Sequence, residues 1–168
     1  CTDCGLCTAV CSYSHEGLAL TDSNIKSYAA WSNDTQVRRK CSSGGVGFEI
    51  GHTLIGKGYK VCGVRYNPDT NRAEHYIAAT VEELIPSIGS KYIQSYTVDG
   101  FKTINRKEKY LVTGTPCQID SFRRYIRKFR CEDNFVLMDF FCHGVPSMWL
   151  WRKYVAEVEK KIGKITYA

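Results

Sequence analysis

The chain has 168 residues, and its 43% hydrophobic and 24% charged residues are typical of one globular domain with a hydrophobic core. No stretch of about 18 apolar residues occurs, so the sequence predicts no transmembrane segment. The net charge of +6 is densest at residues 123–130, where arginines would share one helix face. No recognised binding module accompanies this charge, so we expect no nucleic-acid partner. The helix face is either solvated or docks an acidic electron-transfer protein or a polyphosphate cofactor.

The first eleven residues hold four cysteines at C-x2-C-x2-C-x3-C spacing, namely Cys1, Cys4, Cys7 and Cys11. Three thiolates two residues apart can hold one 4Fe–4S cluster from a single tight loop, and the fourth cysteine of such a run usually binds a second cluster. The motif therefore predicts electron transfer. The chain begins on a candidate ligand and stops inside a strand predicted from residue 164, so we expect it to be truncated at both ends.

Two structural roles compete with cluster binding by these cysteines. A disulfide framework is disfavoured because two-residue spacings are too short for most local bridges. A zinc-stabilised binding module would usually pair two separated C-x2-C units, and His15 is the only imidazole nearby. One departure from the ferredoxin pattern is Ser12, which stands where a proline normally follows the last cysteine. Nine cysteines without a disulfide framework favour a reducing, cytoplasmic environment.

Short elements are predicted between the cysteines and residue 86. The evidence is the spacing of apolar residues, together with capping and turn residues. In chain order we expect an irregular stretch at 12–26, a short strand at 28–31, a helix from Ser43 to about Gly56, a strand at 59–66, a turn at 67–69, a second strand at 73–79, and a short helix that Thr80 caps and Pro86 ends.

The second half of the chain alternates strands and helices. In order we expect a buried strand at 110–114, a helix from Pro116 towards Phe129, a second buried strand at 135–141, a helix from Ser147 to about Lys161, and the strand that begins at residue 164. This alternation predicts an α/β fold, in which a mostly parallel or mixed sheet is flanked by helices. An N-terminal ferredoxin-like iron–sulfur loop precedes it.

Two candidate redox positions follow the predicted strands of the second half. Cys117 lies in the first turn of a helix that begins at Thr115 and Pro116, where the helix dipole favours the thiolate. Cys142 and His143 directly follow the next strand. If the two strands are neighbours, both cysteines lie at one edge of the sheet and could bind a cluster or face a redox cofactor. The alternatives are a buried small residue at 117 and an ordinary turn histidine at 143.

Two further segments could hold a phosphate group. The run Ser42-Ser43-Gly44-Gly45 before a helix offers hydroxyls, free amides and a helix dipole. Gly89-Ser90-Lys91-Tyr92 offers a flexible turn, a cation and an aromatic ring. Neither is a P-loop or a dinucleotide fingerprint, and each is also compatible with an ordinary cap or surface loop.

Six short motifs occur in one order: CTDCGLC, YAAW, CSSGGV, GSKYIQS, TGTPCQI and FCHGVPS, the last followed by a WRKYV helix. This order resembles the beta-subunit family of the deazaflavin-coenzyme hydrogenases and dehydrogenases, including its bacterial members. The resemblance spans nearly all of the chain. One difference is Cys41, which stands where such relatives tend to have serine, so we expect it to be a bystander.

The resemblance implies an iron–sulfur flavoprotein oxidoreductase. Electrons would pass between ferredoxin or a partner redox subunit, 4Fe–4S clusters and FAD, with hydride transfer to or from a deazaflavin-type or other small acceptor. Residues 1–26 would be the C-terminal part of a ferredoxin-like segment, and residues 27–168 an FAD-binding α/β domain that is incomplete at its C-terminus.

The same resemblance implies roles for individual residues. It puts clusters on the four N-terminal cysteines, the redox centre at Cys117, Cys142 and His143, and the FAD pocket at Ser42, Ser43, Gly44, Gly45, Lys91, Thr115 and Pro116. Two alternatives stay open at this point. One is an electron-transfer module without a substrate of its own, and the other is the zinc-stabilised binding module.

Overall fold

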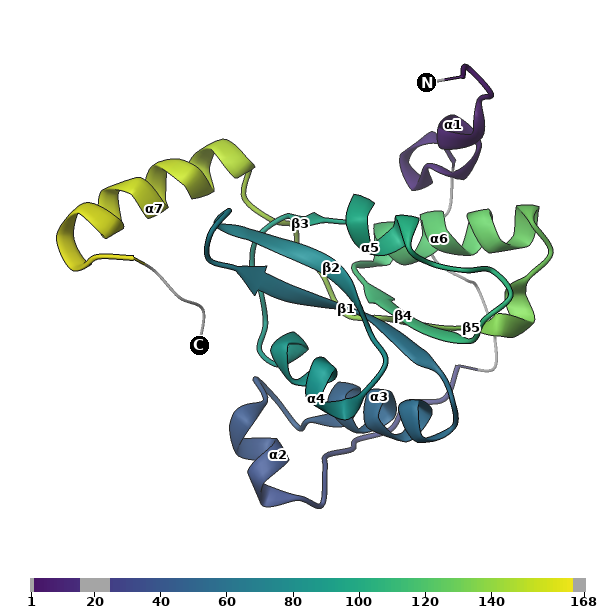
Figure 1. Ribbon diagram of the computed structural model, residues 1–168, viewed down its shortest axis with the longest axis horizontal. Helices are drawn as coiled ribbons and strands as arrows, with labels where there is room; N and C mark the ends of the chain where they lie inside the picture. The colour runs from purple at the N-terminus through teal and green to yellow at the C-terminus, as the bar shows by residue number, and fades with distance from the viewer. Residues whose placement is uncertain (1, 16–24, 165–168) are drawn as a thin grey trace.

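The computed structural model describes residues 2–15 and 25–164 (Figure 1). Its centre is a mixed five-stranded sheet in the order β3-β2-β1-β4-β5. β1 pairs antiparallel with β2 and parallel with β4, and the β4–β5 and β2–β3 pairs are parallel. The strands are β1 (Lys60–Asn67), β2 (Arg72–Ala78), β3 (Ser95–Tyr96), β4 (Tyr110–Gly114) and β5 (Phe135–Asp139). The predicted mixed α/β fold is confirmed.

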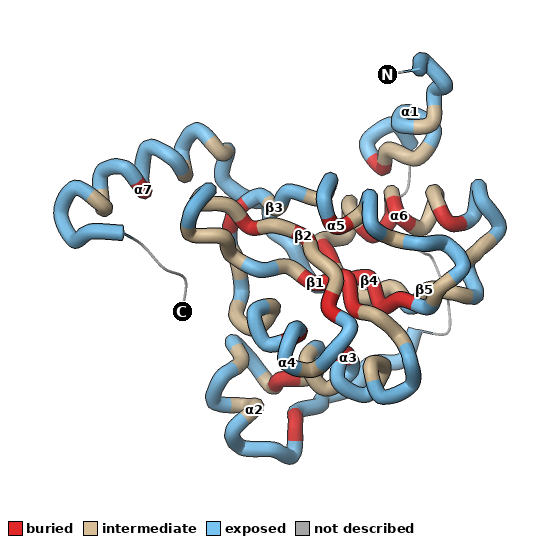
Figure 2. Tube along the Cα trace, viewed as in Figure 1, coloured by how far each residue is buried: buried red, intermediate tan, exposed pale blue. Residues whose placement is uncertain are grey.

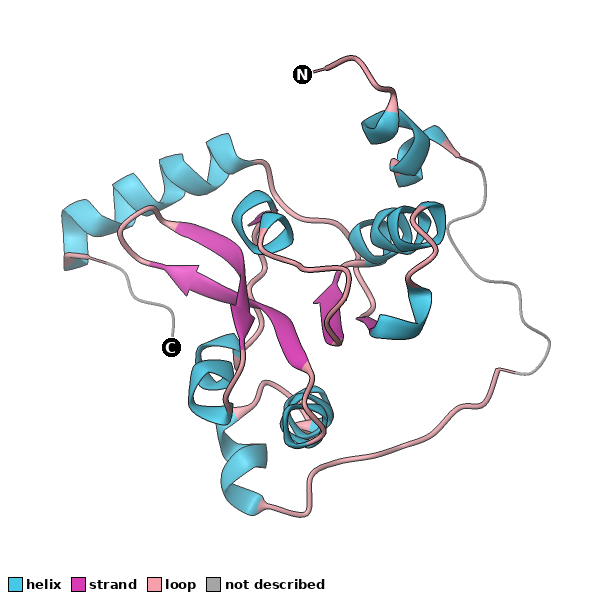
Figure 3. Ribbon diagram, turned by 45° about the vertical axis from the view of Figure 1, so that its right-hand side comes forward, coloured by secondary structure: helices cyan, strands magenta, loops and turns pink. Residues whose placement is uncertain are grey.

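Helices cover both faces of this sheet (Figures 1 and 3). On one face, α3 (Val46–Gly56) and α4 (Val81–Leu84) cover a core of buried residues that includes Val61 and Leu111. On the other face, α5 (Val98–Lys102) and α6 (Pro116–Lys128) cover a second core built on Tyr110, Val112 and Phe122. Figure 2 shows the buried residues concentrated along β1 and β4, between the two helical layers. Burial of apolar side chains on both faces stabilises the central strands.

The arginine-rich part of α6 is partly neutralised by the helix itself. Asp120 is buried, and its carboxylate accepts a 2.9 Å hydrogen bond from Nε of Arg124. Arg123 lies 3.5 Å from the same carboxylate. Both arginine side chains are half-buried, whereas Arg127 and Lys128 are exposed. The basic surface of α6 is therefore smaller than the sequence predicts.

The last described helix, α7 (Met148–Ile162), begins at Ser147, whose Oγ accepts a hydrogen bond from the N–H of Leu150. It contacts the hairpin between β1 and β2 through Trp151. The indole Nε1 of Trp151 donates to the carbonyl of Asn71 at 2.9 Å, and its ring packs edge-on against Tyr66. Much of the rest of α7 is exposed, and within the described residues no helix is both long and apolar enough to cross a membrane.

Several predicted elements are wrong or differ in length. Residues 28–31 form no strand but an irregular segment. β5 ends at Asp139 instead of residue 141, and as an edge strand it is only half-buried, because just one side pairs with a neighbour. Phe141 is 98% exposed. The strand predicted at residues 164–168 lies almost wholly outside the described residues.

Six short elements were not predicted from the sequence. They are α1 (Leu6–Val10), the 3-10 turn η1 (Ser12–Ser14), α2 (Thr35–Lys40), β3, α5 and the 3-10 turn η3 (Glu132–Asn134). Each has six residues or fewer, which is too short for a periodic pattern of apolar residues to be recognised. The short helix that Thr80 caps, α4, ends at Leu84, just before Pro86 as the sequence predicts, and another 3-10 turn, η2 (Ile85–Ser87), follows it directly.

Candidate functional site

The candidate redox cysteines follow two adjacent parallel strands. Gly114 at the end of β4 pairs with Asp139 at the end of β5, so the predicted neighbourhood of these strands is confirmed. Cys117 lies in the first turn of α6, directly after β4, and Cys142 lies in the exposed segment that follows β5. Both therefore follow strands that end at the same carboxyl edge of the sheet, where α/β proteins place their ligands.

Gln118 stabilises the first turn of α6, although it is not among the candidate residues predicted from the sequence. Its Oε1 accepts a hydrogen bond from the N–H of Thr115 at 3.0 Å, and its Nε2 donates to Oγ of Ser95 in β3 at 2.8 Å. The hydroxyl of Thr115 lies 3.2 Å from Sγ of Cys117. A glutamine three residues after a threonine is a known N-terminal capping pattern, and it could have identified this residue from the sequence.

The cysteine-bearing segment packs against α6. Ser12 is buried, and its N–H donates a 3.0 Å hydrogen bond to Oγ of Ser121. Figures 1 and 3 both show α1 next to α6. His15 is hydrogen-bonded through Nε2 to the carbonyl of Ala9, within the same segment. The segment is therefore a small folded unit that sits on the helix carrying Cys117.

Tyr13 lies where this segment meets the two redox candidates. The pKa of its phenol is raised, first by a hydrogen bond with the Cys117 thiol and by the negative charge of Cys117 as a thiolate. The charges of Cys142 and Cys11 act in the same direction. The structure thus brings Tyr13, which carried no sequence signal, into contact with Cys117. His143 is exposed and forms no hydrogen bond within the described residues.

Two of the described cysteines of the N-terminal motif, Cys4 and Cys11, have a lowered pKa. Cys4 and Cys7 are exposed. The backbone N–H of Leu6 lowers the pKa of Cys4, and that of Tyr13 lowers the pKa of Cys11, because each stabilises the thiolate. Within the described ranges no three potential ligands are grouped as a metal site. Cys1 lies outside these ranges, so only two of the three ligands expected for one cluster are described.

The two candidate phosphate segments lie side by side. Oγ of Ser42 accepts a 2.8 Å hydrogen bond from the N–H of Ser90. Gly44 packs closely against the preceding chain, since an added Cβ would lie 3.0 Å from the carbonyl oxygen of Ala30. Gly45 has φ of 79°, a conformation that favours glycine, at the start of α3. Ser43, which precedes the two glycines, is exposed.

The ammonium group of Lys91 is hydrogen-bonded to backbone carbonyls of the same chain. Its ammonium donates hydrogen bonds to the carbonyls of Pro86, Ser87 and Ile88, at 3.3, 3.0 and 2.8 Å. Partial burial lowers the pKa of Lys91 to about 8. All three N–H donors are therefore occupied, and contact with a phosphate would replace at least one of these bonds.

The two groups of candidate FAD residues, at the starts of α3 and α6, lie on opposite faces of the sheet. α3 and α6 each run back along the sheet to the strand that follows them, so both helices start at the carboxyl edge of β1 and β4. Near the start of α3, a Cβ at Gly47 would lie 3.6 Å from Cε of Met138, close to the end of β5. No hydrogen bond joins residues 42–45 to residues 115–117 in the described structure. The carboxyl edge of the sheet lies between residues 42–45 and residues 115–117.

Known proteins resemble this chain in sequence. Two family models of the coenzyme F420 hydrogenase/dehydrogenase beta subunit match it, the N-terminal model over residues 27–101 and the C-terminal model over residues 107–168. The coenzyme F420 hydrogenase beta subunit of Methanococcus voltae is 30% identical over 123 residues, which cover 68% of this chain and 44% of that protein.

The fold also resembles a solved structure, a chain of the F420-reducing NiFe hydrogenase complex from Methanosarcina barkeri. The TM-score is 0.62, with 19% sequence identity, over 85% of this chain and 54% of that chain. At this identity the likeness concerns the fold alone. The present chain spans about half the length of the relatives it matches. Because the two family models together match most of its residues, the chain belongs to the coenzyme F420 hydrogenase/dehydrogenase beta-subunit family.

Proposed function

We propose that this protein is an iron–sulfur flavoprotein oxidoreductase with an electron-transfer role. Electrons pass between ferredoxin or a partner redox subunit, 4Fe–4S clusters and FAD, and a hydride is exchanged with a deazaflavin-type or other small acceptor in a reducing cytoplasm. The single observation that carries the proposal is the packing of the cysteine-bearing segment on α6. This packing supports the proposal because Tyr13, two residues after Cys11, is hydrogen-bonded to the side chain of Cys117.

The residues of the motif suit the clusters. Cys1, Cys4 and Cys7 would hold one cluster and Cys11 a second, and the lowered pKa values of Cys4 and Cys11 favour the thiolates that iron requires. Close packing of the ligand loop on α6 supports electron passage to a cofactor at the sheet edge. The role of the protein here is to position and shield the redox groups.

The sheet edge suits a flavin nucleotide. The start of α6, with Thr115 and Pro116, and the start of α3, with residues 42–45, offer backbone amides and hydroxyls for phosphate and ribose oxygens. Lys91 would contribute a positive charge once one of its carbonyl bonds is exchanged. FAD, when bound, supplies the conversion between single electrons and a hydride. Cys117 and Cys142 then flank the route from the clusters.

The test is the metal and flavin content of the full-length protein, purified without oxygen, together with its visible spectrum. Iron, sulfide and FAD in one sample, with absorbance near 400 nm from the clusters, are the expected result. Zinc without flavin would overturn the proposal and leave a zinc-stabilised binding module. If flavin is present but neither a deazaflavin nor another small acceptor is reduced, the hydride step fails and an electron-transfer module remains.

A further inference from the structure

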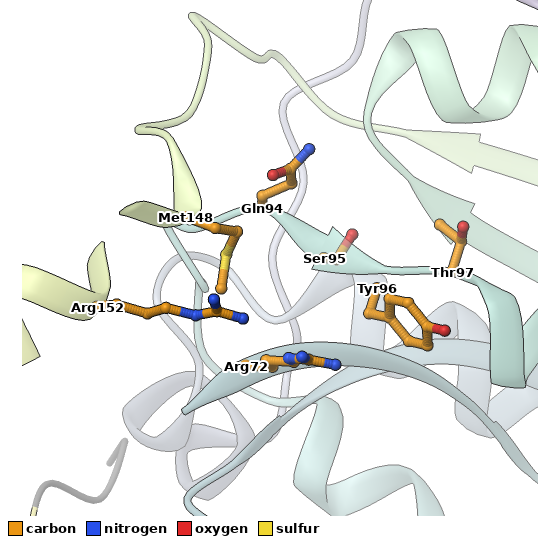
Figure 4. Close-up of a pocket in the computed structure, with 7 residues that line it drawn as sticks. All are labelled: Arg72, Gln94, Ser95, Tyr96, Thr97, Met148 and Arg152. Atoms are coloured by element: carbon orange, nitrogen blue, oxygen red, sulfur yellow. The ribbon is translucent and has the colours of Figure 1, made fainter. Parts of the chain in front are cut away.

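A cavity of about 300 Å³ lies between β2, β3 and the start of α7, outside the residues assigned above to FAD. Arg72 of β2 and Arg152 of α7 line it, together with Tyr96 of β3 and Met148, the first residue of α7 (Figure 4). Figure 4 shows the two arginine side chains extending from different elements toward the same space. Its volume is at the lower end of the roughly 300–1,000 Å³ typical of small-molecule sites.

The cavity is positively charged and holds no compensating acid. No aspartate or glutamate lines it, and among the described residues neither arginine takes part in an ion pair. Arg72 lies over the ring of Tyr96, at 5.5 Å from its centroid, and Arg152 lies over Trp149, at 5.7 Å. Stacking on an aromatic face fixes a guanidinium group but leaves its N–H edge free to donate hydrogen bonds.

This arrangement matches a phosphate group. Two guanidinium groups supply two positive charges, which match a phosphate monoester, at about −1.5 to −2 at neutral pH, or a bridging diphosphate with one negative charge on each phosphate. Arginine binds phosphate through paired N–H donors, and a phosphate has enough oxygens to accept such a pair from each of two arginines. The cavity also adjoins the start of α7, a helix of 15 residues whose dipole adds to the positive potential there.

We propose that this cavity binds the phosphate group of a phosphorylated ligand through Arg72 and Arg152. Its wall is joined to the candidate redox site, because Ser95 lines the cavity and accepts the hydrogen bond from Gln118 at the start of α6. The affinity for phosphate stands independently of the proposed function. The source of the phosphate rests on that function: it is either a second ligand, such as the hydride acceptor, or the diphosphate of FAD, which would then lie here and not at the starts of α3 and α6.

The experiment is a calorimetric titration of the full-length protein with inorganic pyrophosphate, in flavin-free and flavin-loaded form. Arg152→Gln is the main variant, because this residue is exposed and its replacement leaves the core intact. Arg72→Gln is the second variant. The matched control is Arg65→Gln, since Arg65 is also stacked on a tyrosine, Tyr76 at 5.1 Å, but does not line the cavity.

The expected result is pyrophosphate binding by the wild type that each cavity variant weakens by about tenfold or more, with Arg65→Gln unchanged. Binding confined to the flavin-free form, with less FAD retained by Arg152→Gln, identifies the diphosphate of FAD as the ligand. Binding in both forms identifies a second phosphorylated ligand. Absence of binding in the wild type, or equal affinity for Arg152→Gln and Arg65→Gln, overturns the proposal. If the purified protein contains no flavin, the proposed function is wrong, but the titration still tests whether the cavity binds phosphate.

Discussion

The N–H of Ser12 donates a 3.0 Å hydrogen bond to Oγ of Ser121, although 109 positions separate the two residues in the chain. Ser12 directly follows the last cysteine of the N-terminal motif, and Ser121 lies one turn after Cys117 on α6. This bond therefore fixes the position of the cysteine-bearing segment relative to the candidate redox site. A hydrogen bond of this kind contributes about 0.5–1.5 kcal/mol.

Ser121→Ala should loosen the segment from α6 without unfolding it. Amide hydrogen exchange of Ser12, followed by NMR, should become roughly 2–10 times faster, which is the factor that the lost bond energy predicts. The N–H of Cys11, bonded to the carbonyl of Cys7 within the segment, is the internal control and should not change. Equal acceleration at both amides would mean that the segment unfolds instead of undocking.

Cys4→Ser should remove the iron of one cluster, about four atoms per chain, from anaerobically purified full-length protein. The matched control is Cys41→Ser, because Cys41 lies outside the motif and burial raises its pKa, which disfavours the thiolate. Iron and sulfide analysis distinguishes the two variants. Unchanged iron content in Cys4→Ser would show that Cys4 is not a ligand.

Cys117→Ser should slow flavin reduction by ferredoxin more than it lowers stability. The reason is that Cys117 lies between the cysteine-bearing segment and the sheet edge, in contact with Thr115 and Tyr13. Stopped-flow reduction and urea unfolding measure the two effects. Cys131→Ser serves as control, since Cys131 packs against the core at the far end of α6. A normal reduction rate in Cys117→Ser would leave Cys117 as a packing residue.

Stability should fall as the pH is lowered from about 6.5 toward 4. Burial lowers the pKa of His75 to about 4 in the folded state, below its ordinary value of 6.5. Between these values the unfolded chain binds a proton that the folded protein excludes, so the free energy of unfolding drops by roughly 3 kcal/mol across the window. Urea unfolding at pH 7, 6 and 5 measures the slope. His75→Gln should flatten it, and an unchanged slope would assign the effect to other groups.

Gly100→Ala should destabilise the fold by about 1–3 kcal/mol. A Cβ at this position would lie 2.7 Å from the Cβ of His75, so either α5 or β2 must move. Gly56→Ala is the matched control, because nothing lies within 4 Å of the added methyl group at the end of α3. That change should be neutral or stabilising by up to about 1 kcal/mol. Thermal or urea unfolding of both variants gives the comparison.

The β4–α6–β5 unit could be predicted from the sequence because its signals are local. Residues 110–114 form a continuous apolar run, Thr115 and Pro116 mark the start of a helix, and β5 begins at the predicted Phe135. The position of Cys117 and Cys142 after neighbouring strands followed from the tendency of successive strands to pair. The predicted end of β5 was wrong because Phe140 and Phe141 are apolar residues that are nevertheless exposed in the folded protein.

The remaining features of the site depend on contacts between distant parts of the chain. Ser42 meets Ser90 across 48 positions, and Gln118 reaches Ser95 across 23. The three carbonyls that bind Lys91 are close to it in the sequence. They point to its ammonium group only because residues 85–87 form a 3-10 turn, a geometry that was not predicted from the sequence. The YAAW run at residues 28–31 has strand-like composition but no strand to pair with, so it stays irregular.

The sheet register also sets an order of assembly. β1 and β2 pair through a tight local turn, Asn67 opposite Arg72, whereas β1 meets β4 only across about 50 intervening positions, Lys60 opposite Tyr110. Loop closure of that length is costly, so the hairpin forms first and the parallel half of the sheet condenses on it. The cysteine-bearing segment docks on α6, which lies between β4 and β5, so we expect it to dock after that step. The clusters proposed above would then be inserted into a scaffold that has already folded.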